Sequence, residues 1–182
     1  SLEDAFRGTQ VTLDLSVPVH DEQGRTRREA RHVDVRIPKG AGNGQRLRLR
    51  GQGGKGMQGG RDGDLYLNIR LRPHPLFRVD GHDLYIELPL SPWEAALGTT
   101  VELPTLAGPV NLNVPALTAS GRKLRLGKRG LPMPGGGEGD LFALVSIVMP
   151  ASLDDKQQAL FRQLADSSTF NPREKLGWEA KN

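Results

Sequence analysis

Apolar and polar residues alternate along most of the chain, in short runs separated by glycine and proline. Such alternation is typical of half-buried β-strands. The runs occupy residues 11–15, 33–37, 47–49, 65–71 and 84–90. Gly and Pro together make up 36 of the 182 residues, which favours many turns between short strands. The pattern therefore predicts an all-β fold built from small sandwich-like modules.

The first segment of the chain is repeated 90 positions later. Residues 1–13 read SLEDAFRGTQVTL, and residues 91–103 read SPWEAALGTTVEL. In the first copy, residues 2–6 should form a short helical turn that ends at Gly8. The repetition indicates two related β modules in tandem.

Two further matches set the limits of these modules. Residues 45–49 resemble 122–126 at an offset of 77, and GDLY at 63–66 resembles GDLF at 139–142 at an offset of 76. The Pro-His-Pro-Leu segment before residue 77 is too stiff to continue a strand. We therefore expect one module at 1–76, a second at 77–150, and a separate C-terminal segment at 151–182.

The two modules differ in two respects. The offset falls from 90 to 77, so the first module carries 13 extra residues, which lie between Asp14 and Val33. This stretch is polar and centred on Gly24, which predicts an inserted hairpin or a long loop. The strand-like run at 84–90 has no counterpart before Ser1, which suggests a fragment of a longer protein, cut beside a strand.

Beyond Pro150 the pattern becomes helical. Ser152 is the expected N-cap, because Asp155 follows three residues later as in a capping box. One face of the helix is apolar. Its expected members are Leu153, Leu160, Phe161 and Leu164. A lone amphipathic helix buries such a face on its own module or on a second subunit.

Composition narrows the function. The chain has no cysteine, which excludes disulfides and Cys-based zinc sites and suits a reducing compartment. No apolar run approaches the length of a membrane span. The net charge of +4 is uneven, since residues 1–76 contain 14 Lys and Arg against 9 Asp and Glu, whereas residues 77–150 contain 6 against 7.

The basic excess of the first module forms a candidate DNA-binding patch. Such a patch either binds a polyanion or is simply a solvated surface. The candidates are Arg25, Arg27, Arg28 and Arg31 in the insertion, with Arg46, Arg48 and Arg50 on one face of a strand.

The sequence argues against an enzyme. Residues 51–56 match GxGxxG, but further glycines follow where a nucleotide site needs a helix. The four histidines lack metal-ligand spacing, and no nucleophile is paired with a base. We expect no cofactor, no metal and a binding function.

A strand in the first module offers a candidate peptide site. Val11, Leu13 and Leu15 project to one face of it. An extended peptide could add beside this strand, with backbone hydrogen bonds giving affinity and apolar pockets giving selectivity. Alternatively, the three residues are ordinary core.

Several motifs together resemble the C-terminal region of DnaJ-type co-chaperones. They read SLEDAFRGT, IPKGAGNGQRLRLRGQG, GDLYLNI, PHPLF, DLYIELPLSPWEAALG and GDLFALVSIVMP, and they cover essentially the whole chain in register. The resemblance implies two peptide-binding β-sandwich modules followed by a dimerisation helix, with a J domain and a Gly-rich linker upstream. The cysteine-free insertion is similar to that of the zinc-free class.

The resemblance also implies partners. Unfolded client polypeptides would bind a groove lined by Val11, Leu13, Leu15 and Leu67 and pass to a DnaK-type chaperone through the J domain. Homodimerisation would use the C-terminal helix. Resemblance to the branch of this family that binds curved DNA implies a DNA-binding, nucleoid-associated role as an alternative or an addition. The expected location is cytoplasmic.

Overall fold

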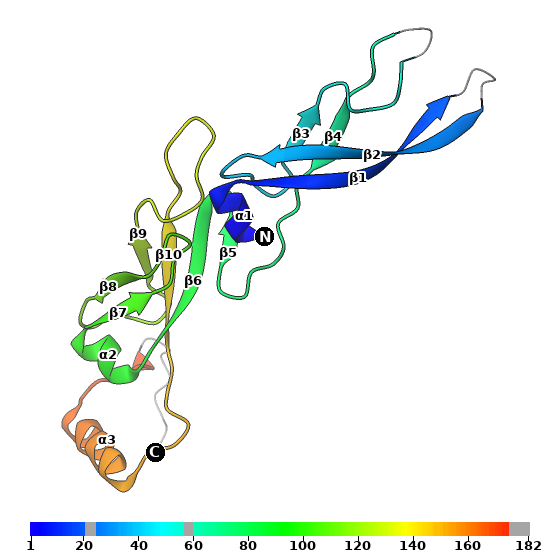
Figure 1. Cartoon of the computed structure of the whole chain (residues 1–182). Helices are drawn as coiled ribbons and strands as arrows, with labels where there is room; N and C mark the ends of the chain where they lie inside the picture. Colours follow the sequence, from blue (N-terminus) through cyan, green and yellow to red (C-terminus); the bar gives the residue numbers. More distant parts are fainter. Residues whose placement is uncertain (21–24, 57–59, 175–182) are drawn as a thin grey trace. The chain divides into compact units, whose positions relative to one another are not determined.

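The computed structural model describes residues 1–20, 25–56 and 60–174 (Figure 1). The chain forms two compact units, Ser1–Ile147 and Val148–Asn182. Strands dominate the first unit, which confirms the predicted all-β class. We call α1 to β4 the first repeat and β5 to β10 the second repeat.

The first repeat contains one short helix and four strands. In chain order these are α1 (Leu2–Arg7), β1 (Thr9–His20), β2 (Thr26–Ile37), β3 (Arg46–Leu49) and β4 (Leu65–Asn68). The strands form two separate antiparallel pairs, β1 with β2 and β3 with β4. Strand β4 is shorter than the alternating run at 65–71 had indicated.

The insertion of the first repeat lengthens a hairpin. Strands β1 and β2 each span 12 residues, and their register runs from Thr9 opposite Ile37 to His20 opposite Thr26. Of the two predicted forms, a hairpin or a long loop, the structure therefore has the hairpin. Gly24 lies outside the described residues.

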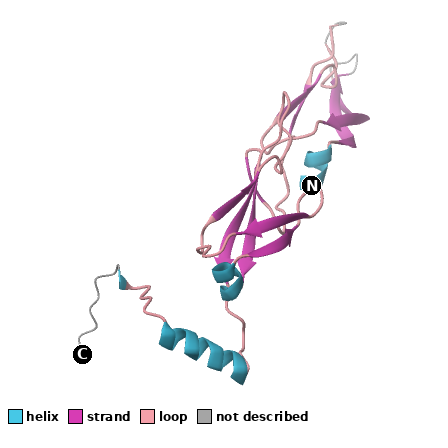
Figure 2. Ribbon diagram, turned by 90° about the vertical axis from the view of Figure 1, so that its left-hand side faces the viewer, coloured by secondary structure: helices cyan, strands magenta, loops and turns pink. Residues whose placement is uncertain are grey.

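The second repeat forms a more complete sandwich. Its elements are β5 (Arg78–Asp80), β6 (Asp83–Leu90), α2 (Pro92–Leu97), β7 (Thr99–Leu103), β8 (Val110–Val114), β9 (Lys123–Leu126) and β10 (Leu141–Ile147). One sheet has the order β5-β6-β10-β9, with β10 parallel to β6 and antiparallel to β9. Strands β7 and β8 form a second, two-stranded sheet, and Figure 2 shows the two groups of strands facing each other.

The two short helices begin and end alike. Ser1 and Ser91 are the N-caps of α1 and α2, and each takes part in a capping box with the acidic residue three positions later. The helices end at Gly8 and Gly98, whose φ angles of 73° and 81° are readily adopted only by glycine. Each glycine then leads directly into the first strand of its hairpin.

Three contacts join the repeats. Leu2 of α1 is 1% exposed and belongs to the same buried cluster as Leu84 and Leu131 of the second repeat. Gly40 is held within the first repeat by its N–H, which donates to the Ala5 carbonyl at 2.7 Å, and it contacts the second repeat. A Cβ on Gly40 would lie 1.9 Å from the carbonyl oxygen of Pro132, so only glycine allows this close approach.

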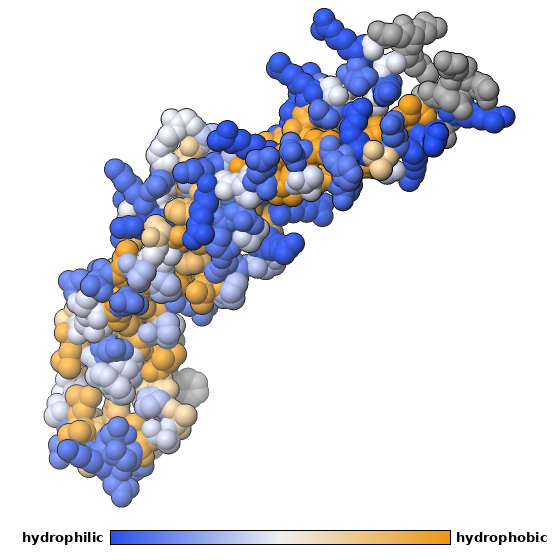
Figure 3. Space-filling model, viewed as in Figure 1, coloured by the Kyte–Doolittle hydropathy of each residue, from blue (hydrophilic) through white to orange (hydrophobic). Residues whose placement is uncertain are grey.

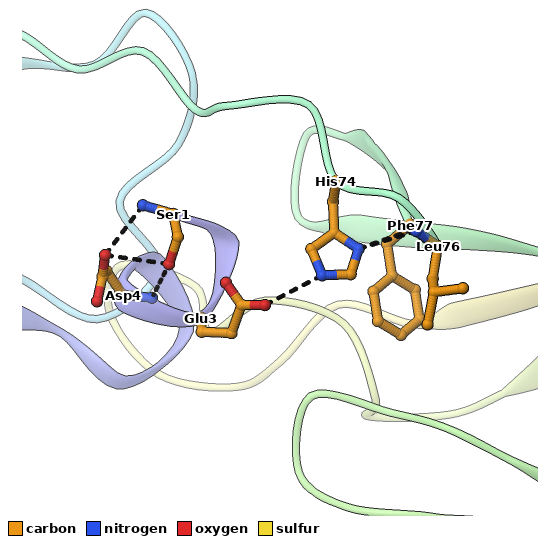
Figure 4. A network of polar contacts seen from close by, with 6 residues as sticks. All are labelled: Ser1, Glu3, Asp4, His74, Leu76 and Phe77. Carbon is orange, nitrogen blue, oxygen red and sulfur yellow. Dashed lines mark hydrogen bonds and ion pairs between the residues drawn. The ribbon is translucent and has the colours of Figure 1, made fainter.

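His74 provides the third contact, from the segment between the repeats (Figure 4). Its Nδ1 accepts hydrogen bonds from the backbone N–H groups of Leu76 and Phe77, both at 3.1 Å. The proton of the neutral ring therefore lies on Nε2, which donates to Glu3 at 3.0 Å. The pKa of the Glu3 carboxyl is lowered, chiefly by its own backbone N–H, and the hydrogen bond from His74 also favours the charged form.

The second unit contains α3 (Asp155–Ser167), and its start corrects the predicted cap. The N-cap is Asp154, which forms a capping box with Gln157, rather than Ser152 with Asp155. Leu153 therefore precedes the helix, while Leu160, Phe161 and Leu164 lie within it.

Candidate functional site

The β1–β2 hairpin has one polar and one apolar face. On the polar face, Thr12 donates to Asp34 at 2.6 Å, and His32 contacts Asp14 across the strands. On the other face, Val11 lies opposite Val35 and Leu13 opposite Val33. Period-two alternation therefore places the predicted peptide-binding residues of β1 on the inner face of the first repeat.

The apolar face of β1 is only partly covered. Val33 and Val35 of β2 are buried, but Leu13 and Leu15 are half-buried and Val11 is 40% exposed. Figure 3 shows apolar side chains reaching the surface along this part of the hairpin. Val11, Leu13 and Leu15 are therefore less covered than Val33 and Val35 on the neighbouring strand.

In the second repeat, the equivalent apolar residues are almost fully buried. Leu103, the counterpart of Leu13, is 3% exposed. Leu67 of β4 is half-buried, whereas its counterpart Ala143 of β10 is completely buried. Equivalent apolar residues are thus more deeply buried in the second repeat than in the first.

Open strand edges accompany this exposure. Within the described residues, β1 pairs with β2 alone, and its counterpart β7 likewise pairs with β8 alone. The two repeats differ at β4, which pairs with β3 alone, whereas its counterpart β10 lies between β6 and β9. Leu67, opposite Leu47 in the β3–β4 pair, stands on a different sheet from the β1 residues. The candidate site therefore combines an unpaired strand edge with apolar side chains from two sheets.

The arginines of the insertion do not form a single patch. Arg27 lies opposite Val19 and shares the face of the apolar residues, while the neighbouring Arg28 points to the other face. Both are exposed, as is Arg25. Arg31 forms an ion pair with Asp62 at 3.8 Å.

The strand arginines have partners of their own. Arg46 lies over the ring of Tyr66, with 5.0 Å to the ring centroid. Arg48 donates to Asp64 at 2.5 Å. Arg50 is exposed and follows the end of β3, so it is a turn residue rather than part of the strand.

The Arg48–Asp64 contact is one of two equivalent turn clamps. The other oxygen of Asp64 accepts the Gly51 N–H at 3.0 Å. In the second repeat, Asp140 accepts from Arg125 at 2.5 Å and from the Lys128 N–H at 3.0 Å. These clamps hold the turns after β3 and β9 against the starts of β4 and β10.

Hydrogen bonding keeps both clamp carboxylates charged. The pKa of Asp64 is lowered first by the Gly51 N–H and then by Arg48. The pKa of Asp140 is lowered first by Arg125 and then by the Lys128 N–H. The sequence had indicated only turn residues here, although an Arg and a Gly-Asp pair recurring at offsets of 77 and 76 pointed to the interaction.

The remaining predicted site lies on α3. Leu160 and Leu164 are 56% and 63% exposed, and Phe161 is half-buried. One helical turn separates Leu160 from Leu164, so the three side chains form one apolar face. Leu153 is half-buried just before the helix.

The described residues contain no group of three or more His, Cys, Asp or Glu side chains arranged to hold a metal ion. No helix in the described part of the chain has the length and apolar character needed to cross a membrane.

Comparison with known proteins identifies the family. Residues 1–150 match the family described as DnaJ C terminal domain. The chain belongs to this family. The resemblance seen in the sequence is thereby confirmed.

Similar proteins carry the name Curved DNA-binding protein. Those of Coxiella burnetii and Salmonella arizonae are each 46% identical over 97% of this chain, and one of Pseudomonas syringae pv. tomato is 46% identical over 94%. The matched regions make up 56%, 58% and 55% of these relatives. The chain thus corresponds to little more than half of each relative.

Proposed function

We propose that the first repeat binds extended apolar segments of unfolded polypeptides by strand addition to β1. Leu13 carries the proposal. In the described residues β1 and its counterpart β7 each pair with one strand, but Leu13 on β1 is half-buried whereas Leu103 on β7 is 3% exposed. Val11, Leu15 and Leu67 supply the other apolar surfaces. Membership of the DnaJ C-terminal family supports a role in binding other proteins.

The energetics favour sequence-tolerant binding. Each backbone hydrogen bond made by an added strand contributes about 0.5–1.5 kcal/mol, whatever the side chains of the client. Covering the exposed apolar surface contributes about 25 cal/mol per Å². The edge therefore provides general affinity, and the alternate side chains select apolar segments.

Leu13→Asp tests the site, with Ser16→Asp as the matched control. Ser16 lies on the opposite face of the same strand, so both variants add one negative charge to β1. We expect Leu13→Asp to weaken binding of a fluorescent apolar peptide by about tenfold or more, and Ser16→Asp to leave it nearly unchanged. Circular dichroism and thermal melts would verify that both variants fold.

A second measurement tests the binding mode. Methylating alternate backbone nitrogens of the peptide removes the hydrogen bonds of an added strand while keeping its side chains. Strand addition predicts a marked loss of affinity for the methylated peptide. Equal binding of the methylated and unmethylated peptides would contradict it, as would equal affinity of the Leu13→Asp and Ser16→Asp variants.

We further propose that α3 mediates homodimerisation, which would give each assembly two peptide sites and hence avidity. The exposed apolar face of Leu160, Phe161 and Leu164 supports this proposal. Phe161→Glu should shift the mass measured by analytical ultracentrifugation toward the monomer. Ala159→Glu, on the other side of the helix, should not. A wild-type chain that is monomeric at micromolar concentration would exclude the dimer.

In the full-length protein, an upstream J domain would deliver bound clients to a DnaK-type ATPase. The family resemblance supports this part of the proposal. Unfolded clients, the ATPase and a second copy of the chain are therefore the proposed protein partners.

The second candidate function is DNA binding, favoured by the name of the relatives and by the basic excess of the first repeat. Phosphate contacts, rather than base reading, would dominate, and affinity would fall steeply with salt. Neutralising Arg25, Arg27 and Arg28 together should lower DNA affinity and flatten the salt dependence. Neutralising Lys156, Arg162 and Arg173 of the second unit removes the same charge elsewhere and provides the control.

A further inference from the structure

A basic pocket lies where the second repeat meets the first. It has a volume of about 450 Å³, and Phe6 and Pro132 contribute apolar walls. Its charged lining consists of Arg7, Lys39, Lys128 and Glu138. The three cations thus outnumber the one carboxylate, and within the described residues none of these three forms an ion pair.

The cations come from three ordered segments. Arg7 is the last residue of α1. Lys39 precedes Gly40, which is fixed by its hydrogen bond to Ala5 and its close approach to Pro132. The backbone of Lys128 is held by the Asp140 clamp. The backbone positions from which the three cationic side chains extend are therefore fixed.

Lys128 occupies a backbone conformation that favours glycine. Its φ is +57°, and its counterpart in the first repeat is Gly51, with φ +67°. Both residues donate their N–H to the clamp aspartate at 3.0 Å. A left-handed conformation costs a non-glycine residue about 1–2 kcal/mol. The second repeat thus keeps a lysine where the same turn, in the first repeat, has glycine.

Packing does not explain this lysine. Its side chain is exposed, and the turn clamp uses only its backbone N–H. Arg7, by contrast, suits the C-terminal turn of α1 electrostatically whether or not a ligand binds. Strain retained at an exposed charged residue in a pocket indicates a binding role.

We propose that Arg7, Lys39 and Lys128 bind a phosphate group of the DNA backbone in this pocket. The inference rests on the proposed DNA-binding function and assigns it a second surface, separate from the insertion arginines. Three cations in the lining of one pocket suit a phosphate, and their charge exceeds that of the single carboxylate, Glu138. Because the lining comes from both repeats, the pocket exists only in the tandem.

Lys128→Gly provides the sharpest test, because it removes the charge and relieves the backbone strain together. We expect a higher thermal midpoint than wild type and, at the same time, weaker binding of a duplex DNA probe in fluorescence anisotropy. The slope of log affinity against log salt should fall in magnitude, by at most the value of about 0.9 that one phosphate contact contributes. A merely structural lysine would not change that slope.

Arg129→Gln is the matched control. It removes one positive charge from the adjacent exposed residue, which does not line the pocket. Its effect on the salt slope should be clearly smaller than that of Lys128→Gly. The triple variant Arg7→Gln, Lys39→Gln and Lys128→Gln removes the whole pocket contact and should reduce the slope by about 0.9, the contribution of one phosphate.

The outcomes separate this inference from the broader proposal. If the wild-type chain binds no DNA, the DNA-binding function itself fails, and this inference with it. If wild type binds DNA and Lys128→Gly keeps the same slope, or Arg129→Gln loses as much, only the pocket is excluded. If a polyglutamate peptide depends on Lys128 and DNA does not, the pocket binds acidic polypeptides and the inference is overturned.

Discussion

In the second repeat, β10 lies between β6 and β9 in the main sheet. Its counterpart in the first repeat, β4, pairs with β3 alone in the described structure. The consequence is seen at the equivalent pair Leu13 and Leu103, of which the first is half-buried and the second 3% exposed. Two copies of one sequence pattern thus differ in how deeply their apolar residues are buried. The second repeat covers Leu103 almost fully, whereas the described residues of the first repeat leave Leu13 half-buried.

Alanine substitution at the equivalent leucines tests this contrast most strongly. Leu103→Ala empties a buried site and should lower the free energy of unfolding by about 3 kcal/mol. Leu13→Ala removes a half-exposed side chain and should lower it by about 1 kcal/mol. Chemical denaturation of both variants measures the difference. Equal losses would show that the first repeat is as tightly packed as the second.

The junction of the repeats gives the next largest effect. Gly40→Ala places a Cβ against the Pro132 carbonyl at a residue with φ +75°, and should cost about 2 kcal/mol. Gly42→Ala is the control, because a Cβ there meets nothing within 4 Å. Thermal unfolding followed by circular dichroism would show the loss. A Gly40→Ala melt that matches Gly42→Ala would mean that the repeats do not depend on this contact.

The smallest expected effect concerns the two turn clamps and pH. Both Asp64 and Asp140 have lowered pKa values in the folded chain. Their stabilisation is therefore present above the ordinary aspartate range near pH 4 and is lost as the pH falls through the lower folded values. Asp140→Asn should make the free energy of unfolding less dependent on pH in the acid range, and Asp64→Asn should do the same through the first repeat. If both variants kept the pH dependence of the wild-type chain, the clamps would be excluded as acid-sensitive contacts.

The alternating pattern predicted most of the fold because one face of each strand packs inward. It indicated the ends of β2 and β6 well, since Pro38 and Ser91 stop the alternation there. It did not distinguish a hairpin from a loop in the insertion. Arg27, Glu29 and Arg31 occupy the inward positions of β2 there, so charge conceals the strand period.

The helix start was predicted wrongly for a specific reason. Ser152 with Asp155 and Asp154 with Gln157 both match the spacing of a capping box, and the structure has the second. Aspartate at the N-cap adds a favourable interaction with the helix dipole, which serine lacks. Composition alone does not rank such overlapping caps.

The candidate sites, like the fold, were predicted only in part from the sequence. The face of Val11, Leu13 and Leu15 was predictable from period two, but its partial exposure depends on which strands lie beside it. The arginines were counted as one patch, and the register of the hairpin places Arg27 and Arg28 on opposite faces. The sequence did not predict a role for Lys128, because its significance lies in a backbone angle.

The parallel pairing of β6 with β10 has a consequence for the order of folding. Leu84 and Leu141 are partners 57 positions apart, whereas Val19 and Arg27 in the hairpin are 8 apart. Local pairs form faster than distant ones. During synthesis, the hairpin therefore emerges and pairs well before the second repeat can close its sheet. Charged residues on β2 then act as gatekeepers, which discourage edge-to-edge association between neighbouring nascent chains.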